Sequence, residues 1–115
     1  MHLVVFILKQ AELMDDILIH MADHHITGGT ILEGTGMAEA LVQMEDLPLF
    51  GVLRKALAGE EREACKVMLF VAEEKQISEI REAIGEVVDL NKQNTGILFA
   101  LPVTMVEGLG GNKWS

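Results

Sequence analysis

The sequence has few of the residues on which several classes of protein depend. It contains one cysteine, Cys65, no tyrosine, and nine lysines and arginines against eighteen acidic residues. A single cysteine excludes an intramolecular disulfide framework and is compatible with a reducing compartment. Nucleic acids and anionic membranes are bound by clustered basic side chains, so the net charge of -9 argues against both as main partners. We therefore expect no nucleic-acid partner.

Long hydrophobic runs are also missing. No stretch reaches the roughly 18 to 20 apolar residues of a membrane-spanning helix, and the N-terminus lacks a charged region followed by a long apolar one. Half of the residues are apolar but only 4% are aromatic, so the core must be aliphatic. We expect one soluble, cytoplasmic domain over residues 1–115, with a surplus of apolar surface that favours self-association.

Hydrophobic periodicity predicts four strands and two long helices. The predicted elements, in chain order, are a strand at 3–8, a helix at 11–24, a strand at 28–36, an excursion at 38–64, a strand at 66–72, a helix at about 74–88 and a strand at 96–103. This order predicts an α+β, ferredoxin-like βαββαβ sandwich with two helices on one face of an antiparallel sheet. The other face would expose apolar residues to water unless another copy covered it, so we expect a homo-oligomer packed through its sheets.

The stretch Thr27–Met37 is expected to be the central piece around which the other elements lie. Glycines at 28 and 29 open its strand and Gly34 and Gly36 close it, and a glycine lets backbone approach a neighbour or a ligand closely. The stretch is open to two interpretations, a phosphate cradle or a strand with turn glycines. It lacks both the G-x-G-x-x-G fingerprint and the lysine of a P-loop.

Several stretches together resemble the PII nitrogen-regulatory signal-transduction proteins and their PII-like relatives. The stretches are Met14-Asp15-Asp16-Ile17, Thr27-Gly28-Gly29-Thr30, Glu33-Gly34-Thr35-Gly36-Met37, Val71 to Ile84 and Gly96 to Val103. The resemblance covers roughly residues 3–106. It implies a homotrimer in which three ferredoxin-like sheets form an inner barrel, with ligand clefts between the subunits.

The resemblance also implies where a ligand and a partner would bind. Family members commonly bind adenine nucleotides between the base of a flexible T-loop, a B-loop and the C-terminal segment, and their T-loop contacts transporters, enzymes or regulators. Here the T-loop would be 38–64, the B-loop 89–96 and a loose tail 107–115. The implied ligand-binding residues are Gly34, Thr35, Gly36, Met37, Lys92, Asn94 and Gly96. The candidate partner-binding residues are Leu49, Phe50 and Leu53, in the apolar stretch 47–57, which is open to two interpretations, a partner-docking face or a short helix packed on its own subunit. A membrane transporter or a metabolic enzyme would be the regulated target.

Some basic residues of the family are missing from this chain. The B-loop lysine falls on Ile97, and the two phosphate-binding arginines fall on Gly108 and Gly110. Charge-assisted bonds are the strong ones to phosphate, so their loss favours a different or reduced small-molecule effector over ATP, with Lys92 as a substitute cation. A chain without tyrosine also lacks the T-loop tyrosine that is modified in some relatives.

His20 and His24 stand four residues apart in the first predicted helix, with His25 adjoining. This spacing can place two imidazoles on one helix face, as metal sites do. The plainer interpretation is exposed histidines near a helix C-terminus, where positive charge complements the helix dipole. Metal binding corresponds to a second hypothesis, a trimeric protein of the CutA-like kind. We do not expect an enzyme, because no nucleophile and base can be assembled from these residues.

Overall fold

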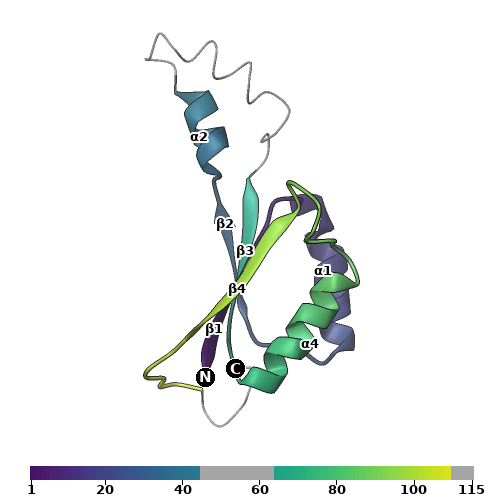
Figure 1. Ribbon diagram of the computed structural model, residues 1–115, viewed down its shortest axis with the longest axis vertical. Helices are drawn as coiled ribbons and strands as arrows, with labels where there is room; N and C mark the ends of the chain where they lie inside the picture. Colours follow the sequence, from purple (N-terminus) through teal and green to yellow (C-terminus); the bar gives the residue numbers. More distant parts are fainter. Residues whose placement is uncertain (45–63, 110–115) are drawn as a thin grey trace.

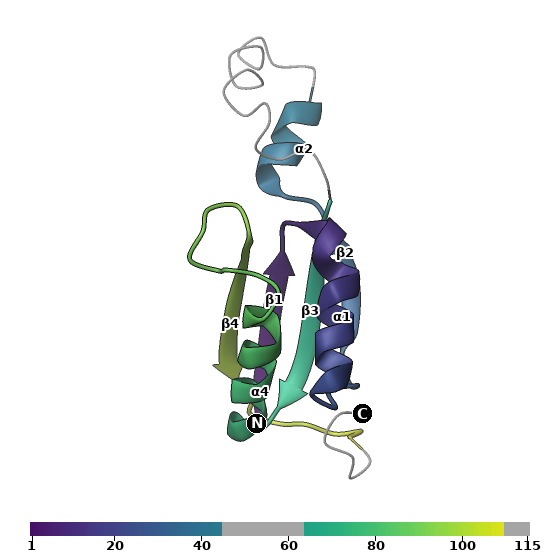
Figure 2. The same ribbon diagram turned by 90° about the vertical axis from the view of Figure 1, so that its right-hand side faces the viewer.

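The computed structural model describes residues 1–44 and 64–109, which form a small α+β domain. Its elements are β1 (His2–Leu8), η1 (Ala11–Leu13), α1 (Met14–Asp23), β2 (Thr30–Gly34), α2 (Met37–Gln43), β3 (Cys65–Ala72), α4 (Glu74–Gly85) and β4 (Gly96–Pro102). The strands form one antiparallel sheet in the order β2-β3-β1-β4, and α1 and α4 lie on the same face of it (Figures 1 and 2). This arrangement confirms the expected α+β class and is compatible with a ferredoxin-like fold.

The glycine-bounded strand β2 lies at an edge of the sheet, and the expectation that it is central was wrong. The two central strands are β1 and β3, and all seven residues of β1 pair with both β3 and β4. β1 is a continuous apolar run, which suits a strand with a neighbour on each side. β2 pairs with β3 alone, over five residues.

The core lies between the sheet and the two long helices. Alternate residues of β1 and β3 point at the helices, as the period of a strand requires. The buried apolar residues are Val4, Phe6, Leu8, Met68, Phe70 and Ala72 from the sheet, Met14, Ile17 and Met21 from α1, Ile80, Ala83 and Ile84 from α4, and Ile26 and Val88 from the segments that follow the helices. Full burial of a large aliphatic or aromatic side chain contributes about 1.5–3 kcal/mol, so this layer supplies most of the folding free energy.

Helix α4 begins with a reciprocal cap and ends earlier than its apolar spacing predicts. The backbone N–H of Glu73 donates to Oε1 of Gln76 at 2.7 Å, and the two residues form a capping box. The helix ends at Gly85, so Val87 and Val88, expected within it, follow its end. Val88 is still buried. Apolar spacing continued past the helix because the residues that follow pack on the same core.

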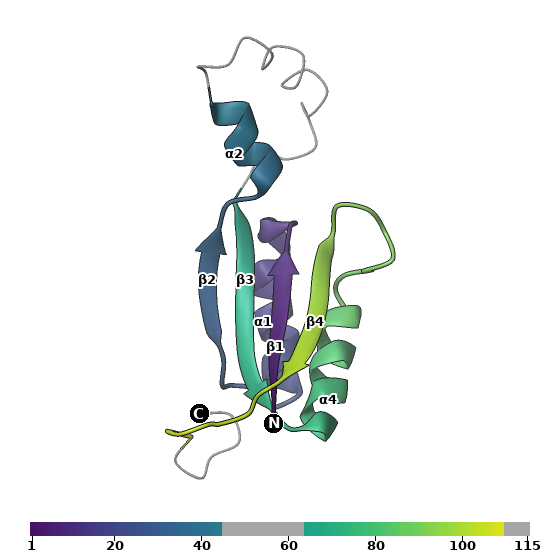
Figure 3. The ribbon, with the colours of Figure 1, turned by 60° about the vertical axis from the view of Figure 1, so that its left-hand side comes forward.

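No helix formed by residues 1–44 or 64–109 lies on the second face of the sheet (Figure 3). We call it the open face. Its residues, taken from the pairing register, are Leu3, Val5 and Ile7 of β1, Thr30, Leu32 and Gly34 of β2, Cys65, Val67, Leu69 and Val71 of β3, and Ile97, Phe99 and Leu101 of β4. No charged side chain belongs to this face in the four described strands. Ile97 and Phe99 are 51% and 45% exposed.

Replacing Gly96 by alanine should destabilise the fold. A Cβ at this position would lie 2.7 Å from the carbonyl oxygen of Ile7, and backbone cannot move aside as a flexible side chain can. We expect Gly96→Ala to lower the free energy of unfolding by about 1–3 kcal/mol, the range of overpacked positions. Urea unfolding at one fixed protein concentration measures the loss.

Gly85→Ala is the matched control for that substitution. A Cβ at Gly85 would meet no atom within 4 Å, and alanine is the better helix former. The control should therefore keep the stability of the wild type or raise it slightly. Equal losses for the two variants would contradict the steric explanation for Gly96.

Candidate functional site

The two halves of the expected ligand site lie at one end of the sheet but at its opposite edges (Figure 3). Gly34 ends β2 at one edge, and Gly96 begins β4 at the other. The register places Lys66 opposite Glu33 and Leu8, and Leu8 opposite Gly96. Three strand spacings of about 4.8 Å, roughly 14 Å in all, therefore separate the two edges. Within one chain the two halves are therefore not neighbours.

The segment Gly34–Met37 joins β2 to α2. A Cβ at Gly34 would lie 2.9 Å from Sγ of Cys65, so this glycine allows a close approach between two neighbouring strands. Gly36 precedes α2 in an extended conformation, and its carbonyl accepts the N–H of Ala40 at 3.0 Å. Met37 is 79% exposed. The segment thus presents an apolar side chain and a stretch of extended backbone beside the sheet.

A cation lies next to this segment but is already paired. Nζ of Lys66 on β3 forms an ion pair with the Glu33 carboxylate on β2. The hydrogen bond and the charge of Lys66 hold the pKa of Glu33 below its ordinary value. An anionic ligand at Gly34 would have to compete with Glu33 for this ammonium group.

The loop before β4 is held by its own hydrogen bonds. The N–H of Asn91 donates to Oδ1 of Asp89, and the Thr95 hydroxyl donates to the carbonyl of Lys92, both at 3.0 Å. Asn94 has a φ of 62°, a left-handed conformation that asparagine tolerates. These bonds leave the Lys92 side chain exposed to solvent. Lys92 can therefore reach a ligand or a second chain.

A cavity adjoins the helix side of this loop. It has a volume of about 470 Å³ and is lined by Arg81, Gly85, Val88, Asp89, Leu90, Asn91 and Leu98. None of the expected ligand-binding residues lines it. In the described part of one chain, the implied ligand cleft is therefore not present as a cavity beside this loop.

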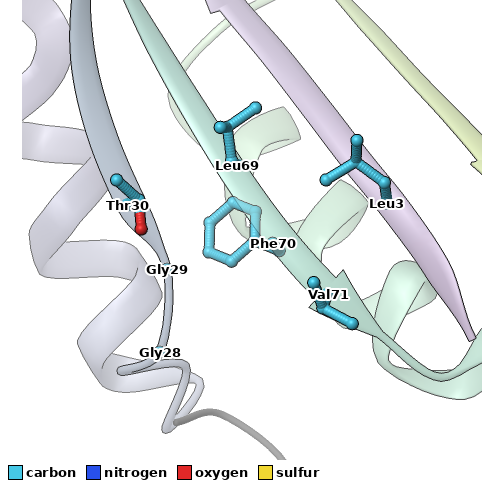
Figure 4. Close-up of a pocket in the computed structure, with 7 residues that line it drawn as sticks. All are labelled: Leu3, Gly28, Gly29, Thr30, Leu69, Phe70 and Val71. Carbon is cyan, nitrogen blue, oxygen red and sulfur yellow. The ribbon is translucent and has the colours of Figure 1, made fainter. Parts of the chain in front are cut away.

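Gly28 and Gly29 border a cavity at the other end of the sheet (Figure 4). Its volume is about 290 Å³, and its remaining lining residues are Leu3, Thr30, Leu69, Phe70 and Val71. A Cβ at Gly29 would lie 2.7 Å from the Phe70 ring. No lining residue is charged, so the geometry favours strand packing over a phosphate cradle for these two glycines.

The structure brings His20 and His24 together with a carboxylate that the sequence reading missed. Nδ1 of His20 and Nε2 of His24 each lie 3.0 Å from the same oxygen, Oε1 of Glu86. Hydrogen bonds to the two imidazoles hold the pKa of Glu86 below its ordinary value, and the bond to His20 has the larger effect. Glu82 adds a second carboxylate beside His24. We call these four residues the histidine–glutamate cluster.

One signal for this cluster was present in the sequence. Glu82 and Glu86 repeat the four-residue spacing of His20 and His24, on the second predicted helix. Two helices on one face of a βαββαβ sheet are neighbours, so such pairs can meet. Which turns would meet depends on the crossing of the helices, which periodicity does not give.

The expected partner-binding residues Leu49, Phe50 and Leu53 lie outside the described residues. Of the expected loop 38–64, the structure describes residues 38–44 and 64, most of them in α2. No helix in the described parts of the chain is both long enough and apolar enough to cross a membrane.

The chain matches no protein-family model and no curated protein sequence. What can be said of its function therefore rests on its residues and their geometry.

The Glu33–Lys66 pair should make stability depend on pH. Because the folded-state pKa of Glu33 lies below 4.5, its contribution to stability is present above that pH and is lost as the pH falls through the lowered pKa. Glu33→Gln should be slightly less stable than wild type near pH 7, and the difference should shrink at a second, acidic pH below the lowered pKa of Glu33. Urea unfolding at the two pH values measures it.

Glu79→Gln, at an exposed position of α4, is the matched control. It removes one carboxylate without removing the pair with Lys66. The pH dependence assigned to the pair is refuted if Glu33→Gln and Glu79→Gln follow the same curve.

Proposed function

We propose that this chain is a PII-like signal-transduction protein. It assembles as a homotrimer through the open face, binds a small-molecule effector between subunits, and regulates a partner protein through the loop 37–64. The proposal is supported by the resemblance of the sequence, by a sheet order compatible with a ferredoxin-like fold, and by the surfaces that this fold leaves uncovered.

The open face is the observation that carries the assembly. It is uncharged and largely apolar across all four strands, and Ile97 and Phe99 on β4 are about half exposed. Exposed apolar patches of this kind mark interaction surfaces in soluble proteins. A surface with no charge in its described residues suits contact with copies of itself, because no like charges would be brought together. The expected number of subunits, three, is inferred only from the resemblance of the sequence to the PII family.

The positions of the two half-sites support a cleft between chains. In a ring, each chain uses two different surfaces, so one edge of a subunit meets the opposite edge of the next. Gly34–Met37 at the β2 edge would then face residues 92–96 at the β4 edge of a neighbour. Assembly would bring together the two segments that about 14 Å of sheet separates within one chain.

The charges near the half-sites restrict the effector. Lys92 is exposed, whereas Lys66 is neutralised by Glu33. A triphosphate needs several positive or amide donors to replace its hydration, and the charges described here favour an adenine nucleotide or other anion of lower charge. Binding would act as a switch if the effector has a higher affinity for one state of the loop than for another.

A charge on the open face should dissociate the assembly. We expect the wild type to have three times the 12.6 kDa mass of one chain in light scattering at micromolar concentration, and Ile97→Glu to be monomeric. The unpaired carboxylate would be buried in the interface, which is strongly unfavourable.

Ile19→Glu is the control, because Ile19 is 58% exposed on α1, away from the open face. This variant should remain trimeric. A monomeric wild type, or equal behaviour of the two variants, would remove the assembly from the proposal.

Calorimetric titration of the trimer with adenine nucleotides, cyclic dinucleotides and bicarbonate tests the effector. We expect one of these anions to bind, and Lys92→Ala to weaken its affinity at least about tenfold, since a bond to a charged group contributes about 1.5–3 kcal/mol. Lys75→Ala on α4 should leave affinity unchanged. Heats at background level throughout the panel would refute ligand sensing while leaving the assembly intact.

A further inference from the structure

We propose that the histidine–glutamate cluster is a binding site for a divalent transition-metal ion of the zinc class. Its ligands are His20 and His24 from the end of α1 and Glu82 and Glu86 from the end of α4. The site is separate from the proposed effector cleft and does not depend on it. It lies where the two helices that cover one face of the sheet run beside each other (Figures 1 and 2).

The distances among His24, Glu82 and Glu86 are already close to those of a coordination sphere, whereas His20 lies outside this group and contacts it through Glu86. Two ligand atoms that are each about 2.0–2.1 Å from a tetrahedral ion lie about 3.3–3.4 Å apart. Oε1 of Glu86 is 3.0 Å from both imidazole nitrogens. Ligand atoms of His24, Glu82 and Glu86 all lie within 4.8 Å of one another. Small side-chain rotations would admit an ion.

Each helix supplies its two ligands from one hydrogen-bonded turn. The N–H of His24 donates to the carbonyl of His20, and the N–H of Glu86 donates to the carbonyl of Glu82, both at 3.1 Å. This spacing puts both members of each pair on one helix face.

Buried side chains hold the two turns in place. Residues 17 and 21 of α1 and residues 80, 83 and 84 of α4 are in the core. The backbone of the cluster is therefore fixed before an ion arrives, which lowers the cost of ordering the ligands.

The ligand types select the class of metal. Imidazole nitrogen with carboxylate oxygen suits zinc, nickel and copper, whereas calcium and magnesium prefer oxygen ligands alone. The side chains of His24 and Glu86 are 21% and 40% exposed, so an ion can enter from solvent. The cluster belongs to the helical side of the sheet, so the proposed trimer would leave it accessible.

Calorimetric titration of the full chain, without an affinity tag, with zinc chloride tests the site. We expect one zinc ion per chain. His24→Ala and Glu86→Gln should each weaken binding at least about tenfold, the size of effect seen even for residues that only support a metal ligand. Glu86→Gln preserves the shape of the side chain, so this result does not depend on how His24→Ala folds.

His25→Asn is the matched control. His25 is exposed next to the cluster and has a φ of 61°, which asparagine also adopts readily. Its affinity for zinc should stay within about twofold of the wild type. An equal loss in His25→Asn and His24→Ala would overturn the proposal, because it would show unspecific binding by surface histidines.

Thermal unfolding gives a second readout. An ion held between α1 and α4 stabilises the folded chain by mass action, so zinc should raise the Tm of the wild type and of His25→Asn but not of Glu86→Gln. Absence of zinc binding by the wild type overturns the site. Magnesium binding as tight as that of zinc also overturns it, because it would indicate an unselective acidic surface.

Discussion

The structure depends on one mismatch, a sheet that is largely apolar on both faces and described helices that cover only one of them. β1 and β3 place Phe6 and Phe70 under the helices and direct Val5 and Leu69 to the opposite side. The first set forms the core of the domain. No described helix covers the second set. Burial of apolar surface is the dominant favourable term in association as well as in folding. The inference of self-assembly follows from this mismatch.

Much of the fold could be predicted from periodicity, because the strands and helices of this chain differ clearly in period. The continuous run at 3–8 and the helical spacing of Ile17 and Met21 corresponded to β1 and α1. Strand order is a different kind of information. Glycines made 28–36 look like a centre, although a short strand with glycines at both ends also suits an edge, where one neighbour is enough.

The glycines illustrate how far a local pattern can determine a site. Gly29 accommodates the ring of Phe70, and Gly34 accommodates the sulfur of Cys65. Both are therefore explained by packing, whereas a sequence shows only that close approach is possible. Glu86 was missed for the opposite reason. Its four-residue spacing from Glu82 is common in helices, and it becomes informative only when His24, 62 residues earlier in the chain, is placed against it.

The meeting of His24 and Glu86 also joins two helix ends of the same polarity. Each residue is the C-cap of its helix, where unsatisfied carbonyl groups concentrate partial negative charge. α4 has no basic residue in its last turn and adds two carboxylates to that charge. Helix ends of this kind are ordinarily neutralised by lysine or arginine. This corner of the molecule therefore has a local field that attracts positive charge.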